Sequence, residues 1–196
     1  DKRAAMTRVT DLKVRIFADG ADLQGIAEMC RNPVIKGFTT NPTLMRKANV
    51  HDYRAFALEL LSMVRDRPVS FEVFSDEFDE MERQAAEIAS WGHNVYVKIP
   101  VTNSRGEFSG PLITRLAAKG VPINVTALAT LRQVSQVAEC LSNVTPAFIS
   151  LFAGRIADTG RDPVPVVTEA VRILSRRPMA ELIWASPREL LNIFQA

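Results

Sequence analysis

The chain has 196 residues, the size of a single domain. Hydrophobic residues make up 47% of it and charged residues 23%, a balance that excludes a disordered or low-complexity protein. The net charge is +2 and no dense basic run occurs, so we expect no nucleic-acid partner and no membrane-surface partner.

The rarer residue types and the apolar runs limit which sites and which cellular location are expected. Cys30 and Cys140 lack CxxC spacing and are too few for a disulfide scaffold, so reduced thiols are expected. His51 and His93 are too few for a histidine-rich metal site. No uncharged run reaches the roughly 18 apolar residues of a membrane span, and residues 1–5 lack the apolar core of a secretory signal. A cytoplasmic location is therefore expected.

Seven short β-rich runs recur along the chain, dominated by Val, Ile, Phe, Thr and Tyr. Several are almost continuously apolar, which is typical of strands buried on both faces of a parallel sheet. These predicted strands are Lys13–Asp19, Gly37–Asn41, Val69–Phe74, Val95–Pro100, Pro122–Leu128, Ala147–Phe152 and Glu181–Ser186.

Segments of helical length, with apolar residues three and four positions apart, separate these runs. Asp162 before Pro163, and Ser186 before Pro187, each indicate an N-cap followed by proline at the first helical position. The predicted helices are Ala21–Met29, Tyr53–Val64, Met81–Trp91, Leu112–Ala118, Leu131–Leu141, Pro163–Leu174 and Pro187–Phe194.

This alternation predicts an α/β domain with a parallel sheet, either doubly wound and open or closed as a barrel. No GxGxxG or GxxxxGKS/T motif follows a strand, so the usual nucleotide-fold signatures are absent. Polar residues instead lie at the ends of many strands, where a (β/α)8 TIM barrel places its active site. They are Asp19, Asn41, Glu72, Lys98, Asn124, Thr126, Ser150 and Ser186.

We therefore predict a (β/α)8 barrel over residues 13–196, a single domain, with the eighth strand missing from the seven runs found. Either the sequence is truncated or closure is achieved in another way. Residues 1–12 are interpreted as an N-terminal extension, with Met6 a candidate for the natural start.

The strongest chemical signal is the lysine in Val95–Pro100, a strand with the sequence VYVKIP. Burial inside a parallel sheet disfavours the charged ammonium of Lys98, and a neutral lysine amine condenses with a carbonyl to form a Schiff base. The alternative is a strand-end lysine that extends to the surface.

Two carboxylates, like Lys98, lie within predicted strands or at their ends. Asp19 ends the first predicted strand and Glu72 lies within the third, and adjacent barrel strands bring both within reach of Lys98, where they can move protons. Alternatively, Asp19 caps the helix that begins near Ala21, and Glu72 forms an ion pair with a neighbouring element.

Arginines follow the last two predicted strands. Arg155 comes after the sixth, and Ser186 and Arg188 come after the seventh, where a predicted helix begins. Guanidinium groups and a helix N-terminus bind phosphate, and barrels often bind it late in the chain, although two ordinary surface arginines are the alternative.

Neutral polar groups follow two other strands. Thr39 and Asn41 suit sugar hydroxyls, or else form a plain turn before a helix. Asn124 and Thr126 have matched parity, so both face the same side of their strand and in a barrel point toward the lysine.

Taken together, the ordered motifs resemble the transaldolase family, specifically its short members that include the fructose-6-phosphate aldolases. Each motif is weak alone, and the ordered set is specific. The motifs are Phe17–Asp19, Gly37–Thr43, Val69–Val73, Val97–Pro100, Asn124–Thr126, Ser150–Arg155 and Ala185–Arg188.

The resemblance implies a class I aldol mechanism without cofactor or metal, with a Schiff base between Lys98 and a ketose phosphate. Asp19 then handles protons at the substrate hydroxyl, and Glu72, with a water held by Thr126, serves carbinolamine formation and collapse. The implied substrate-binding residues are Thr39, Asn41, Asn124, Ser150 and Phe152, and the implied phosphate-binding residues are Arg155, Ser186 and Arg188.

Two positions resemble true transaldolases more than the aldolases of the family, which have glutamine in place of Glu72 and tyrosine in place of Phe152. The expected activity is transfer of a dihydroxyacetone unit from fructose 6-phosphate or sedoheptulose 7-phosphate to an aldose phosphate, in the pentose phosphate pathway. The alternatives are aldolase cleavage and a non-catalytic sugar-phosphate-binding relative.

The resemblance also implies a ring-shaped homo-oligomer. Two positions depart from the family pattern, which has an aromatic residue at Pro187 and threonine at Gly20.

Overall fold

The structure is a computed structural model that describes residues 11–196. Residues 1–10 of the predicted N-terminal extension lie outside the described residues.

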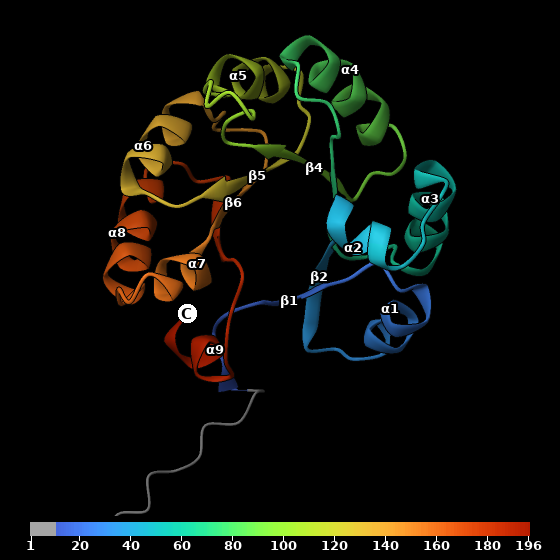
Figure 1. Cartoon of the computed structure of the whole chain (residues 1–196), viewed down its shortest axis with the longest axis horizontal. Coiled ribbons are helices and arrows are strands. Elements are labelled where there is room, and N and C mark those ends of the chain that lie inside the picture. The colour runs from blue at the N-terminus through green and yellow to red at the C-terminus, as the bar shows by residue number, and fades with distance from the viewer. Residues whose placement is uncertain (1–10) are drawn as a thin grey trace, which may run out of the picture.

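A seven-stranded parallel sheet forms the centre of the fold, with the strands in chain order and each paired to the next. Figure 1 shows the sheet curled into an incomplete barrel, with β1 and β7 as its edges. The prediction of a (β/α)8 barrel lacking its last unit is confirmed for the described residues. The strands are β1 (Ile16–Asp19), β2 (Ile35–Thr39), β3 (Val69–Glu72), β4 (Val95–Pro100), β5 (Ile123–Leu128), β6 (Ala147–Leu151) and β7 (Ala180–Trp184).

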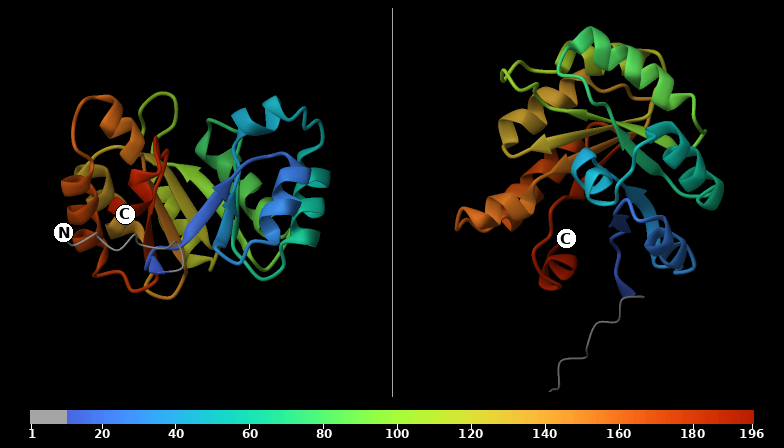
Figure 2. Two further views of the ribbon diagram at one scale, coloured as in Figure 1. Left: turned by 90° about the horizontal axis from the view of Figure 1, so that it is seen from below. Right: turned by 45° about the vertical axis from the view of Figure 1, so that its right-hand side comes forward.

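Helices surround the outer, convex side of this sheet (Figure 2). All seven predicted helices have a counterpart, and two short helices, α2 and α7, were not predicted. The helices are α1 (Leu23–Cys30), α2 (Pro42–Lys47), α3 (Tyr53–Met63), α4 (Phe78–Ala89), α5 (Gly110–Ala118), α6 (Leu131–Cys140), α7 (Ala153–Asp158), α8 (Val164–Leu174) and α9 (Leu191–Gln195).

The last helix corrects a prediction. It begins at Leu191 and not at Pro187, because Ser186 adopts a left-handed backbone with φ of 58° and cannot cap a helix. The side chain of Asn192 instead accepts hydrogen bonds from the backbone N–H groups of Arg188 and Glu189, at 2.8 and 3.1 Å. The predicted helix N-terminus at the phosphate motif is therefore absent.

The other proline-based prediction is wrong by one residue. Helix α8 begins at Val164, and the Asp162 carboxylate accepts a hydrogen bond from the backbone N–H of Val164 at 2.9 Å.

Strand register sorts the side chains into two layers. Paired residues of parallel strands point to the same side, so the pairs Glu72–Lys98 and Lys98–Asn124 place three polar side chains on one face of the sheet. That face is the concave interior. Residues of opposite parity, such as Phe71 and Ile99, are fully buried between the sheet and the helices, which explains the continuous apolar runs in the sequence.

Side chains also connect the two open edges of the sheet. Arg15, just before β1, forms an ion pair with Glu181 of β7, and its guanidinium lies 5.9 Å from the centre of the Phe148 ring. Phe148 stacks on Tyr96 at 4.3 Å and meets Phe17 edge-on at 5.3 Å. This cluster fills the amino-terminal end of the incomplete barrel. Within residues 11–196, no helix is long and apolar enough to cross a membrane.

Gly154, near the start of α7, lies unusually close to the loop that follows β7. A Cβ atom at this position would come within 1.5 Å of the Ser186 carbonyl oxygen, and the Gly154 N–H donates to the Ala185 carbonyl at 3.2 Å. Only glycine permits this approach, which holds two of the predicted phosphate-binding segments together.

Gly154→Ala is expected to destabilise the fold by about 1–3 kcal/mol or more, because the clash is with backbone. Gly20→Ala is the matched control, since a Cβ there meets no atom within 4 Å. Urea denaturation of both variants checks this, and equal stability of the two would contradict the close approach.

Candidate active site

Lys98 lies on the interior face of β4, near the middle of the sheet, and is 8% exposed. Its Nζ donates a hydrogen bond to the Thr40 carbonyl at 3.0 Å and lies 3.4 Å from Glu72 Oε2. The alternative interpretation, a strand-end lysine that extends to the surface, is therefore wrong. A buried amine next to a carboxylate is an arrangement suited to covalent chemistry at a carbonyl.

Glu72 is the carboxylate closest to that amine. Burial raises the pKa of its carboxyl group, the Lys98 charge opposes the shift, and the Asp19 charge adds to it. A carboxyl group with a raised pKa takes up a proton more readily than an ordinary carboxylate and can give it back, which suits acid–base catalysis. The Tyr53 hydroxyl donates to the Glu72 backbone carbonyl at 2.9 Å and fixes the end of β3.

Asp19 and Thr39 form a second polar pair at the ends of β1 and β2. The Thr39 hydroxyl donates to Asp19 Oδ1 at 2.8 Å, and the two residues are register partners. The alternative reading of Asp19 as a helix cap is wrong, because Asp22 caps α1 through the backbone N–H groups of Gln24 and Gly25.

A chain of buried polar side chains crosses the interior from β6 to β3. The Ser150 hydroxyl donates to Asn124 Oδ1 at 2.7 Å, and Asn124 Nδ2 donates to Ser70 Oγ at 3.1 Å. All three residues are at most 5% exposed. Ser70 was not among the predicted site residues, although its parity with Glu72 indicates that it faces the interior.

Thr126 lies within β5, and Asn41 follows the end of β2 by two residues. Thr126 is 6% exposed and pairs with Pro100, two residues beyond Lys98. Asn41 caps α2, with its Oδ1 accepting from the Leu44 N–H at 3.0 Å, so its helix-start interpretation is confirmed. Thr40, next to it, has a buried hydroxyl that finds no hydrogen-bond partner within the described residues.

Arg155 and Arg188 come together at the carboxyl ends of β6 and β7. Arg188 binds the Asp158 carboxylate through Nε at 2.8 Å and Nη2 at 2.5 Å, and Arg155 Nη1 lies 3.8 Å from the same carboxylate. These contacts hold the Asp158 pKa below its usual range. Phe152 immediately precedes α7, and its backbone N–H donates to the Leu128 carbonyl at 2.7 Å.

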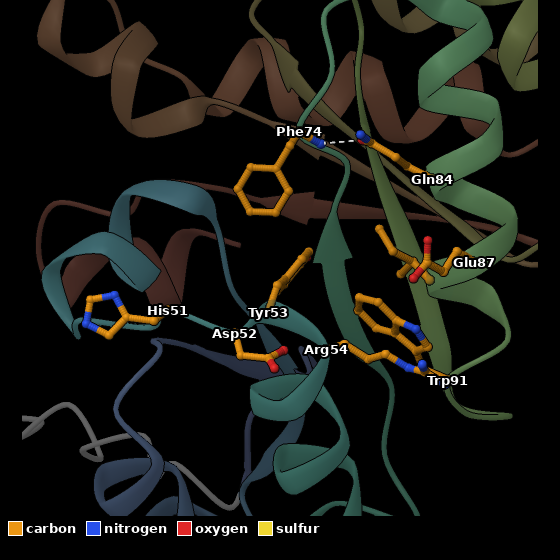
Figure 3. Close-up of a pocket in the computed structure, with 9 residues that line it drawn as sticks. His51, Asp52, Tyr53, Arg54, Phe74, Gln84, Glu87 and Trp91 are labelled. Atoms are coloured by element: carbon orange, nitrogen blue, oxygen red, sulfur yellow. Dashed lines mark hydrogen bonds between the residues drawn. The ribbon is translucent and has the colours of Figure 1, made fainter.

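A separate cavity of about 410 Å³ lies outside the barrel, with Tyr53, Phe74 and Trp91 among the residues that line it (Figure 3). None of the predicted site residues lines it. Tyr53, which lines this cavity, also donates the hydrogen bond to the backbone carbonyl of Glu72.

Comparison with known proteins identifies the family. Residues 16–196 match the family described as transaldolase/fructose-6-phosphate aldolase. The chain belongs to this family.

Proteins named probable transaldolase are similar over most of this chain. The one from Dehalococcoides mccartyi is 34% identical over 93% of this chain and 82% of its own length. Those from Roseiflexus castenholzii and Streptococcus agalactiae serotype V are each 34% identical, over 91% and 92% of this chain and 80% of their own lengths. Among solved structures, a multifunctional pyruvate carboxylase from Rhizobium etli aligns with 86% of this chain and 23% of its own, at 11% identity and a TM-score of 0.43.

Six of the residues that carry the transaldolase resemblance form three groups in the structure. Lys98 and Glu72 make the buried ion pair, Asp19 pairs with Thr39, and the two arginines share Asp158. The fold and membership of the family support an enzyme of the transaldolase kind.

The raised pKa of Glu72 predicts how stability depends on pH. A carboxyl group whose pKa is higher in the folded chain supports folding fully below its unfolded pKa of about 4.3, and that support is lost as pH rises through the folded pKa. Glu72→Gln stays neutral, so the variant is expected to gain stability relative to the unaltered chain between pH 4 and pH 8.

Glu80→Gln is a control of opposite sign, because Arg83 lowers the pKa of the exposed Glu80. This variant is expected to be slightly less stable than the unaltered chain at pH values above the unfolded pKa of about 4.3, and the difference is expected to shrink as pH falls below it. Urea denaturation across the pH series measures both differences, and a Glu72→Gln difference that stays constant with pH contradicts the raised pKa.

Proposed function

We propose that the protein is a transaldolase that transfers a dihydroxyacetone unit through a Schiff base on Lys98. The donor is fructose 6-phosphate or sedoheptulose 7-phosphate and the acceptor is an aldose phosphate, in the pentose phosphate pathway. One observation carries the proposal: the buried Lys98 amine lies 3.4 Å from the Glu72 carboxylate, on the concave face of the sheet.

In this proposal Lys98 is the nucleophile and Glu72 its acid and base. Transfer of a proton from the ammonium to Glu72 frees the amine, which adds to the C2 carbonyl of the ketose to form a carbinolamine. Glu72, with a water held by Thr126, then protonates the hydroxyl, which leaves as water and produces the iminium ion. The raised pKa of Glu72 suits both directions of this transfer.

Asp19 then takes the proton of the C4 hydroxyl. The C3–C4 bond breaks, its electrons pass into the iminium ion to give an enamine on Lys98, and an aldose phosphate leaves. Attack of the enamine on a second aldose phosphate reverses these steps, and hydrolysis then releases the new ketose. The hydrogen bond from Thr39 holds the Asp19 carboxylate in place for this role.

The proposed binding groups come from strands and strand ends on either side of β4. The Ser150–Asn124 pair binds hydroxyls of the dihydroxyacetone unit. Asn41 contributes its amide NH2 to the same unit, because its Oδ1 already caps α2, and Thr39 lines the same site. Arg155, Ser186 and Arg188 bind the phosphate, at strand ends where barrels place such sites.

Two side chains favour transfer over release of free dihydroxyacetone. Glu72 is a carboxyl group and not an amide, which suits proton transfer at Lys98. Phe152 has no hydroxyl to protonate the enamine, so the enamine persists until an aldehyde acceptor arrives.

Consumption of fructose 6-phosphate is therefore expected to depend on an added acceptor that differs from the aldose it releases, such as erythrose 4-phosphate. Without acceptor, the protein should release about one equivalent of aldose phosphate per site and then stop. Phe152→Tyr is expected to raise acceptor-independent release by roughly tenfold or more, since a positioned proton donor contributes about 10²–10⁴ in rate.

The assay follows the ketose and free dihydroxyacetone by chromatography, with Lys98→Ala as the inactive control. Continuous release of dihydroxyacetone by the unaltered protein indicates an aldolase instead. Binding of fructose 6-phosphate without turnover of any kind indicates a non-catalytic relative.

A further inference from the structure

Asp158, the last residue of α7, is the shared partner of the two arginines proposed to bind phosphate. Its Oδ1 accepts from Arg188 Nε at 2.8 Å, and its Oδ2 accepts from Nη2 at 2.5 Å. Arg155 lies on the same helix three residues earlier, with Nη1 at 3.8 Å from Oδ2. One carboxylate thus links the segment after β6 with the segment after β7.

We propose that Asp158 is a positioning residue of a sugar-phosphate site. It orients the Arg188 guanidinium, and keeps Arg155 beside it, so that both meet the phosphate of the substrate. The inference rests on the proposed function, because it requires a phosphorylated substrate.

The hydrogen bonds of Arg188 leave room for such a ligand. A guanidinium has five N–H groups, and three of them have acceptors within the described part of the chain: two bonds go to Asp158 and one, at 3.1 Å from Nη1, goes to the Ser186 carbonyl. One N–H on each Nη remains for a ligand. Two guanidinium groups against one carboxylate also leave net positive charge, so Asp158 does not cancel the attraction for an anion.

The backbone around this group is fixed independently of Asp158. The Gly154 N–H donates to the Ala185 carbonyl at 3.2 Å, and the Arg188 N–H donates to Asn192 Oδ1 at 2.8 Å. Loss of the Asp158 carboxylate therefore frees the Arg188 side chain, which is 38% exposed, without detaching the loop that carries it. The expected defect is local and concerns the phosphate.

The chain offers a matched control for the loss of a carboxylate–arginine pair. Glu169 and Arg172, both on α8, form the same two-point contact, at 2.7 Å from Nε and 2.5 Å from Nη2. This pair is also exposed, and its two residues lie three positions apart on one helix, as Arg155 and Asp158 do. It belongs to none of the three groups of predicted site residues.

The experiment measures kcat and KM for fructose 6-phosphate and for fructose, with saturating erythrose 4-phosphate as acceptor, and the Kd of each sugar by calorimetry. Asp158→Ala is expected to raise the KM and Kd for fructose 6-phosphate by roughly tenfold, the scale of one charged hydrogen-bonding contact. Its kcat, and its constants for fructose, are expected to stay within about twofold, because phosphate binding is remote from the reacting carbons.

Further variants sharpen the test. Asp158→Asn keeps one acceptor oxygen and is expected to show an intermediate loss, and it carries the test if Asp158→Ala does not fold. Glu169→Ala is expected to match the unaltered protein. Arg188→Ala is expected to lose at least as much affinity for the phosphorylated sugar, and adding Asp158→Ala to it should cost little more, since both act through one guanidinium.

Four results overturn the inference. A lower KM for fructose 6-phosphate in Asp158→Ala shows that the carboxylate competes with phosphate, and equal losses for both sugars show a general structural role. If the unaltered protein binds both sugars equally, the phosphate site itself fails, and the proposed substrate fails with it. If the unaltered protein and Arg188→Ala behave as expected and Asp158→Ala is unchanged, only this inference fails.

Discussion

The buried ion pair between Lys98 and Glu72 is the interaction that places the strictest demands on the interior of this fold. Two ionised side chains inside a sheet lose hydration, and their attraction offsets that loss only when the geometry and the surrounding hydrogen bonds are good. Register supplies the geometry, because it makes Glu72 and Lys98 direct neighbours on β3 and β4. The Thr40 carbonyl supplies a further acceptor for the lysine.

The concave face around the ion pair is lined by further polar side chains that are hydrogen-bonded to one another. Polar side chains extend from the lysine across the concave face, from Ser70 through Asn124 to Ser150, and each is hydrogen-bonded to the next. The opposite face of the same strands is apolar and buried under the helices. Along each strand, residues that face the interior carry the polar groups, and the residues between them pack against the helices. A substitution on one face therefore need not disturb the other.

Sequence periodicity predicted all seven strands, because continuous apolar runs leave few other structures available to them. It failed where the backbone is set by contacts distant in the chain. Ser186 takes a left-handed conformation against Gly154, so the helix expected from the serine–proline pair begins at Leu191. Asp158 was missed for the same reason, since its partner Arg188 lies 30 residues away and no local pattern marks the pair.

Borohydride trapping tests directly whether Lys98 forms a Schiff base with the substrate. The protein is incubated with fructose 6-phosphate, reduced, and analysed by intact-mass and peptide mass spectrometry, with Lys98→Ala as the control. A dihydroxyacetone or fructose 6-phosphate adduct is expected on the peptide that contains Lys98, and none is expected in the variant. An adduct on another lysine, or no adduct on folded protein that binds fructose 6-phosphate, would contradict a Schiff-base role for the buried Lys98–Glu72 pair.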